Sequence, residues 1–109
     1  MKRYEVLLTL AAEKDLEELH DYVSTFDSPD KADRLLDRIL DLVGDLASAP
    51  ERGSVPRELQ SVGILEYRQI MLASYRLIYR TVEDCVIIYV IADGRRDFQT
   101  LLAGRLLSS

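Results

Sequence analysis

The sequence contains only one cysteine and one histidine in 109 residues, and these shortages exclude several kinds of site. Cys85 has no second cysteine with which to form an internal disulfide, so we expect the protein in a reducing cytoplasm. His20 and Cys85 alone cannot supply a zinc site, or a Cys–His or Ser–His nucleophilic pair. We therefore predict that the protein uses no metal and no cofactor.

Long apolar runs and known catalytic motifs are missing as well. Residues 4–12 are apolar, but Glu5 and Thr9 interrupt them, acidic residues follow, and no small-residue cleavage site appears, so they do not predict a signal peptide. No run approaches the length of a membrane span. The patterns G-x-S-x-G, H-E-x-x-H, the phosphate loop and the dinucleotide fingerprint are absent. We expect a protein with no membrane partner that binds rather than catalyses.

Charge is distributed unevenly along the chain. Residues 1–51 hold 13 acidic and 6 basic side chains, a net charge of −7, whereas residues 52–109 hold 6 acidic and 8 basic ones, a net charge of +2. The overall charge of −5 disfavours a general nucleic-acid binder, because phosphate affinity depends on positive charge. The acidic half is suited to a basic partner. The alternative interpretation is that it only keeps the protein in solution.

The first half predicts a strand followed by two helices. Residues 4–9 have the apolar, β-branched and aromatic content of a strand. Thr9 can cap the next helix, while Ser28 and Pro29 signal the start of a second helix that runs to about Ser48. The short linker makes the two helices an antiparallel hairpin. The expected buried stripes are Ala12, Leu16, Leu19, Val23 and Phe26, then Ala32, Leu35, Leu36, Ile39, Val43 and Leu46.

An acidic row follows one exposed face of the second predicted helix at four-residue spacing: Asp33, Asp37, Asp41 and Asp45. Carboxylates perform acid–base catalysis when burial shifts their pKa, and a solvated row provides no such burial. We therefore predict no catalysis there. Gly44 costs this helix about 1 kcal/mol relative to alanine, so we expect another element to approach closely at that position.

The second half predicts a loop, a three-stranded meander and a short final helix. Residues 49–65 form the loop, the strands are residues 66–72, 75–82 and 85–92, and the helix is residues 98–107. If the strand residues Tyr67, Met71, Leu77 and Tyr79 face the helices, Arg68, Arg76 and Arg80 converge on an open face. Arginine recognises phosphate or carboxylate groups, which suggests an anion-binding surface. The alternative is that these arginines are solvated and paired with nearby acids.

Five segments, in this order and spacing, resemble the RelE/ParE toxin superfamily of bacterial toxin–antitoxin modules. They are DLEEL (15–19), PERG (50–53), EYR (66–68), SYRLIYR (74–80) and DGRRD (93–97). The resemblance covers nearly the whole chain, and we predict that residues 1–109 form a single domain. It implies an α+β fold of order β-α-α-β-β-β-α, with an antiparallel sheet packed against the helical hairpin. The DGRRD turn with the leucines and Arg105 that follow is most similar to the ParE branch.

The superfamily includes two activities, and the residues favour one of them. RelE-like members cleave mRNA on the ribosome with basic sheet residues and a C-terminal aromatic or histidine, whereas ParE-like members poison DNA gyrase. Arg68, Arg76 and Arg96 match basic positions of the RNase pattern. Ile70 and Leu102 replace a second basic residue and a tyrosine, so no group is expected to activate a 2′-hydroxyl. The resemblance therefore implies a gyrase inhibitor without enzymatic activity.

The resemblance also implies a ParD-like antitoxin that wraps the toxin and forms a hetero-oligomer with it. We predict that target binding uses Arg68, Arg76, Arg80, Arg95, Arg96 and Arg105. We predict that antitoxin binding uses Leu16, Leu19, Asp37, Asp41 and Tyr79, the apolar and acidic residues near the hairpin and sheet edge. Sequence-specific nucleic-acid binding is not expected. A RelE-like mRNA interferase and a non-toxic, antitoxin-binding member are the alternatives.

Overall fold

The computed structural model describes residues 2–107 and contains four strands and four helices in that range. Their order is β1 (Glu5–Leu8), α1 (Leu10–Phe26), α2 (Pro29–Leu46), α3 (Arg57–Gln60), β2 (Tyr67–Leu72), β3 (Tyr75–Val82), β4 (Cys85–Asp93) and α4 (Phe98–Leu107). The predicted order is confirmed, with one addition. The short helix α3 lies in the segment that the sequence indicated as a loop. No helix within residues 2–107 combines the length and apolarity needed to cross a bilayer.

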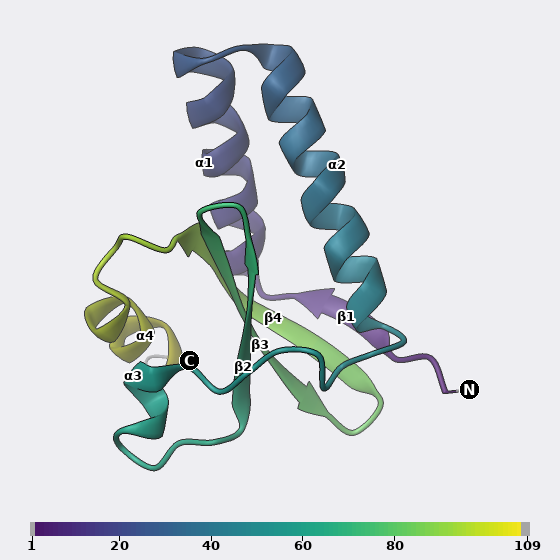
Figure 1. The fold of residues 1–109 in the computed structure, drawn as a ribbon, viewed down its shortest axis with the longest axis vertical. Coiled ribbons are helices and arrows are strands. Elements are labelled where there is room, and N and C mark those ends of the chain that lie inside the picture. The colour runs from purple at the N-terminus through teal and green to yellow at the C-terminus, as the bar shows by residue number, and fades with distance from the viewer. Residues whose placement is uncertain (1, 108–109) are drawn as a thin grey trace.

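The strands form one sheet in the order β1-β4-β3-β2. The meander of β2, β3 and β4 is antiparallel, as expected, but β1 pairs with β4 in parallel, so the sheet as a whole is mixed. The α1–α2 hairpin stands against one face of this sheet, whereas α3 and α4 lie together on the other side (Figure 1). We call these the hairpin face and the α4 face.

Side-chain caps begin both long helices at the predicted residues. Thr9 Oγ1 accepts a hydrogen bond from the backbone N–H of Ala12 at 3.1 Å. Ser28 Oγ accepts one from Lys31 N–H at 3.1 Å, and Pro29 occupies the first turn, where its missing N–H costs nothing. Each cap satisfies a backbone donor that the helix itself leaves unpaired.

Two expectations about the helices are wrong. Phe26 was expected in the buried stripe of α1, but 74% of its surface is exposed because the end of the hairpin projects beyond the sheet (Figure 1). Gly44 was expected at a close contact, but a Cβ built on it meets no atom within 4 Å. No close contact therefore explains the glycine at this position, which costs the helix about 1 kcal/mol relative to alanine.

A separate apolar cluster is buried on each face of the sheet. On the hairpin face, Ala12, Ile39, Leu42, Val43 and Leu46 pack on Leu77, Tyr79, Val86, Ile88 and Ile91. On the α4 face, Leu59, Phe98 and Leu102 pack on Ile78, Val90 and Ala92. The register shifts between Ile78 and Tyr79, which pair with Val90 and Ile88 and leave Tyr89 as an extra residue in β4. This bulge lets Tyr89 and Val90 both pack on the α4 face.

Candidate functional site

Arg76 lies on the α4 face, where neighbouring side chains already bind its guanidinium. Its guanidinium donates two hydrogen bonds to the Glu58 carboxylate, at 2.9 and 3.0 Å, and another to Gln69 Oε1. The guanidinium carbon is also 4.0 Å from the centre of the Phe98 ring, and only 11% of the side chain is exposed. These bonds from Arg76 lower the pKa of Glu58. Arg76 is thus paired within the fold, and its role in target binding stays a prediction.

Arg68 lies on the opposite face from Arg76. It pairs in register with Tyr79, and its guanidinium donates to the carbonyl oxygens of Gly53 at 2.7 Å and Glu51 at 3.3 Å. The prediction that Arg68, Arg76 and Arg80 converge on one face is therefore wrong. Arg68 holds the loop before α3 against the sheet and does not share a binding surface with Arg76.

Tyr79 is fully buried beside Arg68, so the structure contradicts its place in an antitoxin-binding surface. Its hydroxyl donates to the carbonyl oxygen of Pro50 at 2.8 Å and accepts from Gly53 N–H at 2.9 Å. Burial raises the pKa of this hydroxyl. Gly53 approaches the sheet so closely that a Cβ would collide with the carbonyl oxygen of Gln69. Tyr79 therefore holds the 50–53 loop in place.

Arg80 is the third strand arginine and stays on the α4 face. Its guanidinium carbon is 5.7 Å from the centre of the Tyr67 ring, and that ring makes an edge contact with Tyr89 at 5.3 Å between ring centres. Arg80 is half-buried in this aromatic group.

Arg105 was predicted to bind the target, but it holds α4 to α1 and β4. Its guanidinium donates to both carboxylate oxygens of Asp15 and, at 2.8 Å, to the carbonyl oxygen of Tyr89. Asp15 is only 9% exposed and also accepts a bond from Ile91 N–H at 3.0 Å. The hydrogen bond to Asp15 raises the pKa of Arg105. Both charges are therefore used inside the fold, and a role of Arg105 in target binding stays a prediction.

Arg95 and Arg96 lie on the exposed turn between β4 and α4. The guanidinium of Arg95 donates to Asp93 at 2.7 and 3.0 Å, yet 86% of that side chain stays exposed. The hydrogen bonds from Arg95 lower the pKa of Asp93 to about 2. Arg96 is exposed, and its side chain has no ion-pair partner within residues 2–107. Of the six predicted target-binding arginines, these two are the ones that the fold presents to solvent.

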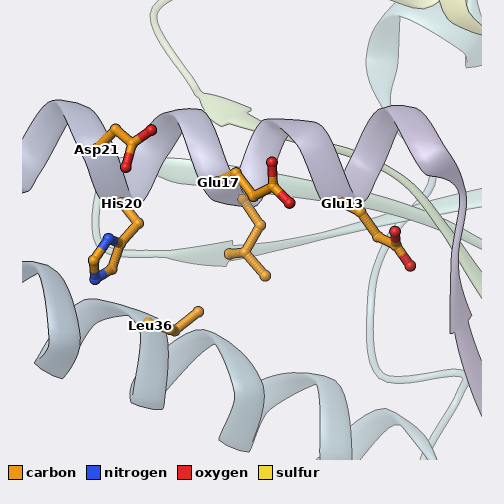
Figure 2. Close-up of a pocket in the computed structure, with 6 residues that line it drawn as sticks. Glu13, Glu17, His20, Asp21 and Leu36 are labelled. Carbon is orange, nitrogen blue, oxygen red and sulfur yellow. The ribbon is translucent and has the colours of Figure 1, made fainter.

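The predicted acidic surface on the hairpin contains a groove between α1 and α2 of about 570 Å³. Figure 2 shows carboxylates from α1 along the groove, with Leu36 of α2 across from them. Its lining consists of Glu13, Leu16, Glu17, His20, Asp21 and Leu36. His20 Nε2 lies 2.8 Å from Asp33 Oδ1 and links the two helices at one end.

The groove contains only part of the predicted antitoxin-binding set. Leu16 lines it, Asp37 and Asp41 are exposed on α2, and Leu19 is half-buried against the hairpin-face cluster. The sequence-based prediction named the acidic row of the second helix and did not include the carboxylates of α1. Their four-residue spacing at positions 13, 17 and 21 was the signal for an acidic row along one side of the groove.

Ile70 and Leu102, the two positions that argued against RNA cleavage, are both packed in the core. Ile70 packs on the hairpin-face cluster, and Leu102 is 1% exposed in the cluster under α4. Because strand side chains alternate, the β2 residues that share the face of Arg76 are Tyr67, Gln69 and Met71. None of these three residues is basic. Within residues 2–107, no three metal-binding side chains are grouped to hold an ion.

Comparisons with known proteins agree with this arrangement of hairpin, sheet and α4. Three solved toxin structures share the fold. The toxin of the chromosomal ParDE system from Pseudomonas aeruginosa is 18% identical, with 84% of this chain and 96% of that chain covered and a TM-score of 0.69. The toxin–antitoxin complex RelBE2 from Mycobacterium tuberculosis is 25% identical, with 85% of this chain and 93% of that chain covered and a TM-score of 0.63. A mutant of the Escherichia coli toxin RelE in the free state is 15% identical, with 96% of this chain and 98% of that chain covered and a TM-score of 0.65.

The chain therefore has the fold of the proteins in these three structures. A family profile described as "ParE toxin of type II toxin-antitoxin system, parDE" matches residues 6–98. The chain belongs to this ParE toxin family. No curated protein sequence matches the chain significantly.

Proposed function

We propose that this ParE-family toxin inhibits DNA gyrase by binding it, and that it does not cleave RNA. The observation that carries the proposal is the state of Arg76, the arginine at the centre of the α4 face. It is neutralised by Glu58, stacked on Phe98 and nearly excluded from solvent. An arginine in this environment is not available to a scissile phosphate, and its neighbours Gln69 and Met71 cannot act as acid or base at neutral pH.

The proton-transfer group near Arg76 is the Glu58 carboxylate, and both of its oxygens already accept hydrogen bonds from Arg76. Leu102 is buried where the related RNases would place an aromatic or histidine, and His20 lies on the hairpin, paired with Asp33. The chemistry that remains is recognition by exposed arginines and aromatic rings. Inhibition of gyrase by binding requires no further chemistry. The inhibitor must also be a protein of the cytoplasm, where gyrase acts on DNA.

We further propose that a ParD-like antitoxin neutralises the toxin by placing a basic amphipathic segment on the hairpin groove. Leu16 and Leu36 offer apolar contacts, and every acidic or basic residue in the lining except His20 is a carboxylate. An amphipathic helix in an apolar groove is a common form of recognition, and basic residues on its edges would meet Glu13, Glu17 and Asp21. Asp37 and Asp41 extend the negative field along α2 and would steer the approach.

The test compares two reactions with the same purified toxin. We expect wild type to block supercoiling of relaxed DNA by purified gyrase, or to trap cleaved DNA, and to leave translation in a cell-free system unchanged. The double variant Arg95→Ala/Arg96→Ala is expected to lose gyrase inhibition. The control Arg34→Ala/Arg38→Ala removes two exposed arginines of α2 and is expected to inhibit as wild type does.

Two outcomes would contradict the proposal. Normal supercoiling together with cleaved mRNA on ribosomes would identify an mRNA interferase. Normal growth of cells that express the toxin without antitoxin, with both reactions unaffected, would identify a non-toxic antitoxin-binding protein.

A further inference from the structure

Two exposed aromatic rings lie together near the C-terminal end of α1. Tyr22 and Phe26 expose 62% and 74% of their surfaces, and their ring centres are 4.8 Å apart. They are four residues apart and so lie on the same side of the helix, and neither belongs to the two buried clusters. Large apolar rings gathered on the surface of a small protein mark a contact surface rather than a packing requirement.

A cleft of about 360 Å³ begins at Tyr22 and ends at the turn after β4. Its apolar lining comes from Leu19, Ile91 and Ala92, Tyr22 and Tyr75 contribute rings, and Arg95 and Arg96 contribute guanidinium groups. We call Phe26, Tyr22, Tyr75, Arg95 and Arg96 the turn-side surface. Tyr22 belongs both to the aromatic pair and to the cleft, so this surface is continuous from the hairpin to the arginine turn.

At its turn end, the turn-side surface carries an arginine that no carboxylate neutralises. Arg96 lines the cleft, and its guanidinium has no carboxylate partner within residues 2–107. Of the three carboxylates in the cleft lining, Asp15 is bound by Arg105 and Asp93 is bound by Arg95, while Glu18 lies exposed on α1. The hairpin groove differs, because carboxylates and no arginine line it. A basic segment that suits the groove would therefore be repelled by Arg96, and the two surfaces are suited to different partners.

We infer that the turn-side surface is where this toxin contacts its target protein, and that it binds a segment in which a carboxylate neighbours a large apolar side chain. The apolar side chain would pack against Tyr22 and Phe26, while a carboxylate accepts paired hydrogen bonds from Arg96. Aromatic residues and arginine dominate the binding energy of protein interfaces. The inference deepens the proposed function and rests on it in one respect, since it takes the target to be a protein.

The experiment uses variants of residues that the core does not need. Tyr22→Ser/Phe26→Ser removes the aromatic pair, and Arg96→Glu reverses the charge. Leu10→Ser is the matched control, because Leu10 is 84% exposed on the same helix, at its other end.

Three readouts are growth arrest in cells, the toxin concentration that halves gyrase supercoiling, and the urea midpoint, which reports folding. Each cleft variant should raise the half-inhibitory concentration at least about tenfold and relieve growth arrest, with an unchanged midpoint. Leu10→Ser should match wild type.

The outcomes separate this inference from the gyrase proposal. If wild type inhibits gyrase and both cleft variants inhibit it equally well, the turn-side surface is not the target site and gyrase remains the target. If wild type arrests growth with gyrase unaffected, gyrase is the wrong target, while relief of arrest in both variants still supports the turn-side surface. If wild type sediments as a dimer that Tyr22→Ser/Phe26→Ser converts to a monomer, a second copy covers the surface and the inference is wrong.

Discussion

Arg68 and Arg76 are eight residues apart in neighbouring strands, yet they lie on opposite faces of the sheet. The turn between β2 and β3 contains two residues, Ala73 and Ser74, so Leu72 pairs with Tyr75 and Ile70 pairs with Leu77. Paired residues share a face, which puts Ile70 with Leu77 in the core and Arg68 with Tyr79. The alternation within each strand was predicted correctly, but the faces of β2 were reversed relative to β3. A two-residue turn fixes this register, and counting from it would have given the right faces.

The bond network of Arg76 could not be predicted in the same way. Glu58 reaches it from α3, a helix of one turn that begins after Pro56. Four residues are too few to show helical periodicity, so nothing in the sequence indicated that a carboxylate returns to cover the α4 face at this point.

The pair of Glu58 and Arg76 predicts a dependence of stability on pH. Glu58→Gln removes the charge that Arg76 binds and should lower the free energy of unfolding by about 1–3 kcal/mol at neutral pH. The pKa of Glu58 is lowered in the folded state from its ordinary value of 4.5, chiefly by hydrogen bonds from Arg76. Its stabilisation is therefore present above pH 4.5 and is lost as the pH falls through the lower folded value.

Urea denaturation at about pH 7 and about pH 3 measures this difference, since wild type and Glu58→Gln should converge in acid. Glu66→Gln changes an exposed carboxylate and should behave as wild type at both values. A gap between wild type and Glu58→Gln that stays constant from neutral to acid pH would show that the ion pair does not stabilise the fold.

Among the elements, α4 depends on one ion pair as well as on apolar packing. Phe98 and Leu102 bury it against the sheet, and Arg105 ties it to Asp15 of α1. The sequence predicted the position and length of α4 from its apolar residues. It gave no sign of the ion pair, because Asp15 and Arg105 are 90 positions apart in the chain. The sequence around each of them has a composition that is common on protein surfaces. The parallel direction of β1 was also missed, since a four-residue strand carries no information on direction.

Breaking this ion pair should destabilise the protein strongly. Asp15→Asn keeps an acceptor for Ile91 N–H but leaves the half-buried guanidinium of Arg105 without its carboxylate. We expect a loss of about 3–5 kcal/mol in the free energy of unfolding, as for other buried pairs that lose one partner. Glu18→Gln, on the exposed surface one turn away, should change it by less than about 0.5 kcal/mol.

A double-mutant cycle with Arg105→Gln measures the coupling directly in urea titrations. Additive effects of Asp15→Asn and Arg105→Gln would mean that the two side chains act independently and that α4 is held by packing alone.

For the molecule as a whole, the two oppositely charged surfaces agree with the charge imbalance between the halves of the sequence. The acidic groove belongs to the hairpin, and the arginine turn belongs to the second half. The sequence therefore predicted the acidic character of the hairpin and the order of the elements. It could not predict the cleft between Tyr22 and Arg96, because tertiary packing brings together residues from α1, β3 and the turn after β4.

Salt should weaken antitoxin binding through its association rate. The carboxylates at the hairpin groove are exposed, and a higher ionic strength shortens the range of their field from about 10 Å at 0.1 M to about 3 Å at 1 M. We expect the association rate constant for the antitoxin to fall at least about tenfold between these two salt concentrations. Surface plasmon resonance measures it.

A variant of the groove carboxylates distinguishes steering by the hairpin groove from steering by the overall charge of the protein. Glu13→Gln/Glu17→Gln/Asp21→Asn should slow association in low salt and reduce its salt dependence. Glu83→Gln/Asp84→Asn, at the turn between β3 and β4, should leave both unchanged. Association that is equally fast at both salt concentrations would rule out steering by the hairpin.

The pairing of β1 with β4 has a consequence for the time course of synthesis. Glu5 pairs with Cys85, and Asp15 binds Arg105, so β1 and one side of α1 have no partners until that later part of the chain has been translated. At roughly 5–20 residues per second, the ribosome takes several seconds to add the intervening residues. The hairpin, residues 10–46, is translated in the first half of that interval, whereas the arginine turn after β4 is translated only near or after its end. Under the binding mode proposed for the antitoxin, the growing chain therefore carries the antitoxin-binding groove before it carries the arginines of the turn.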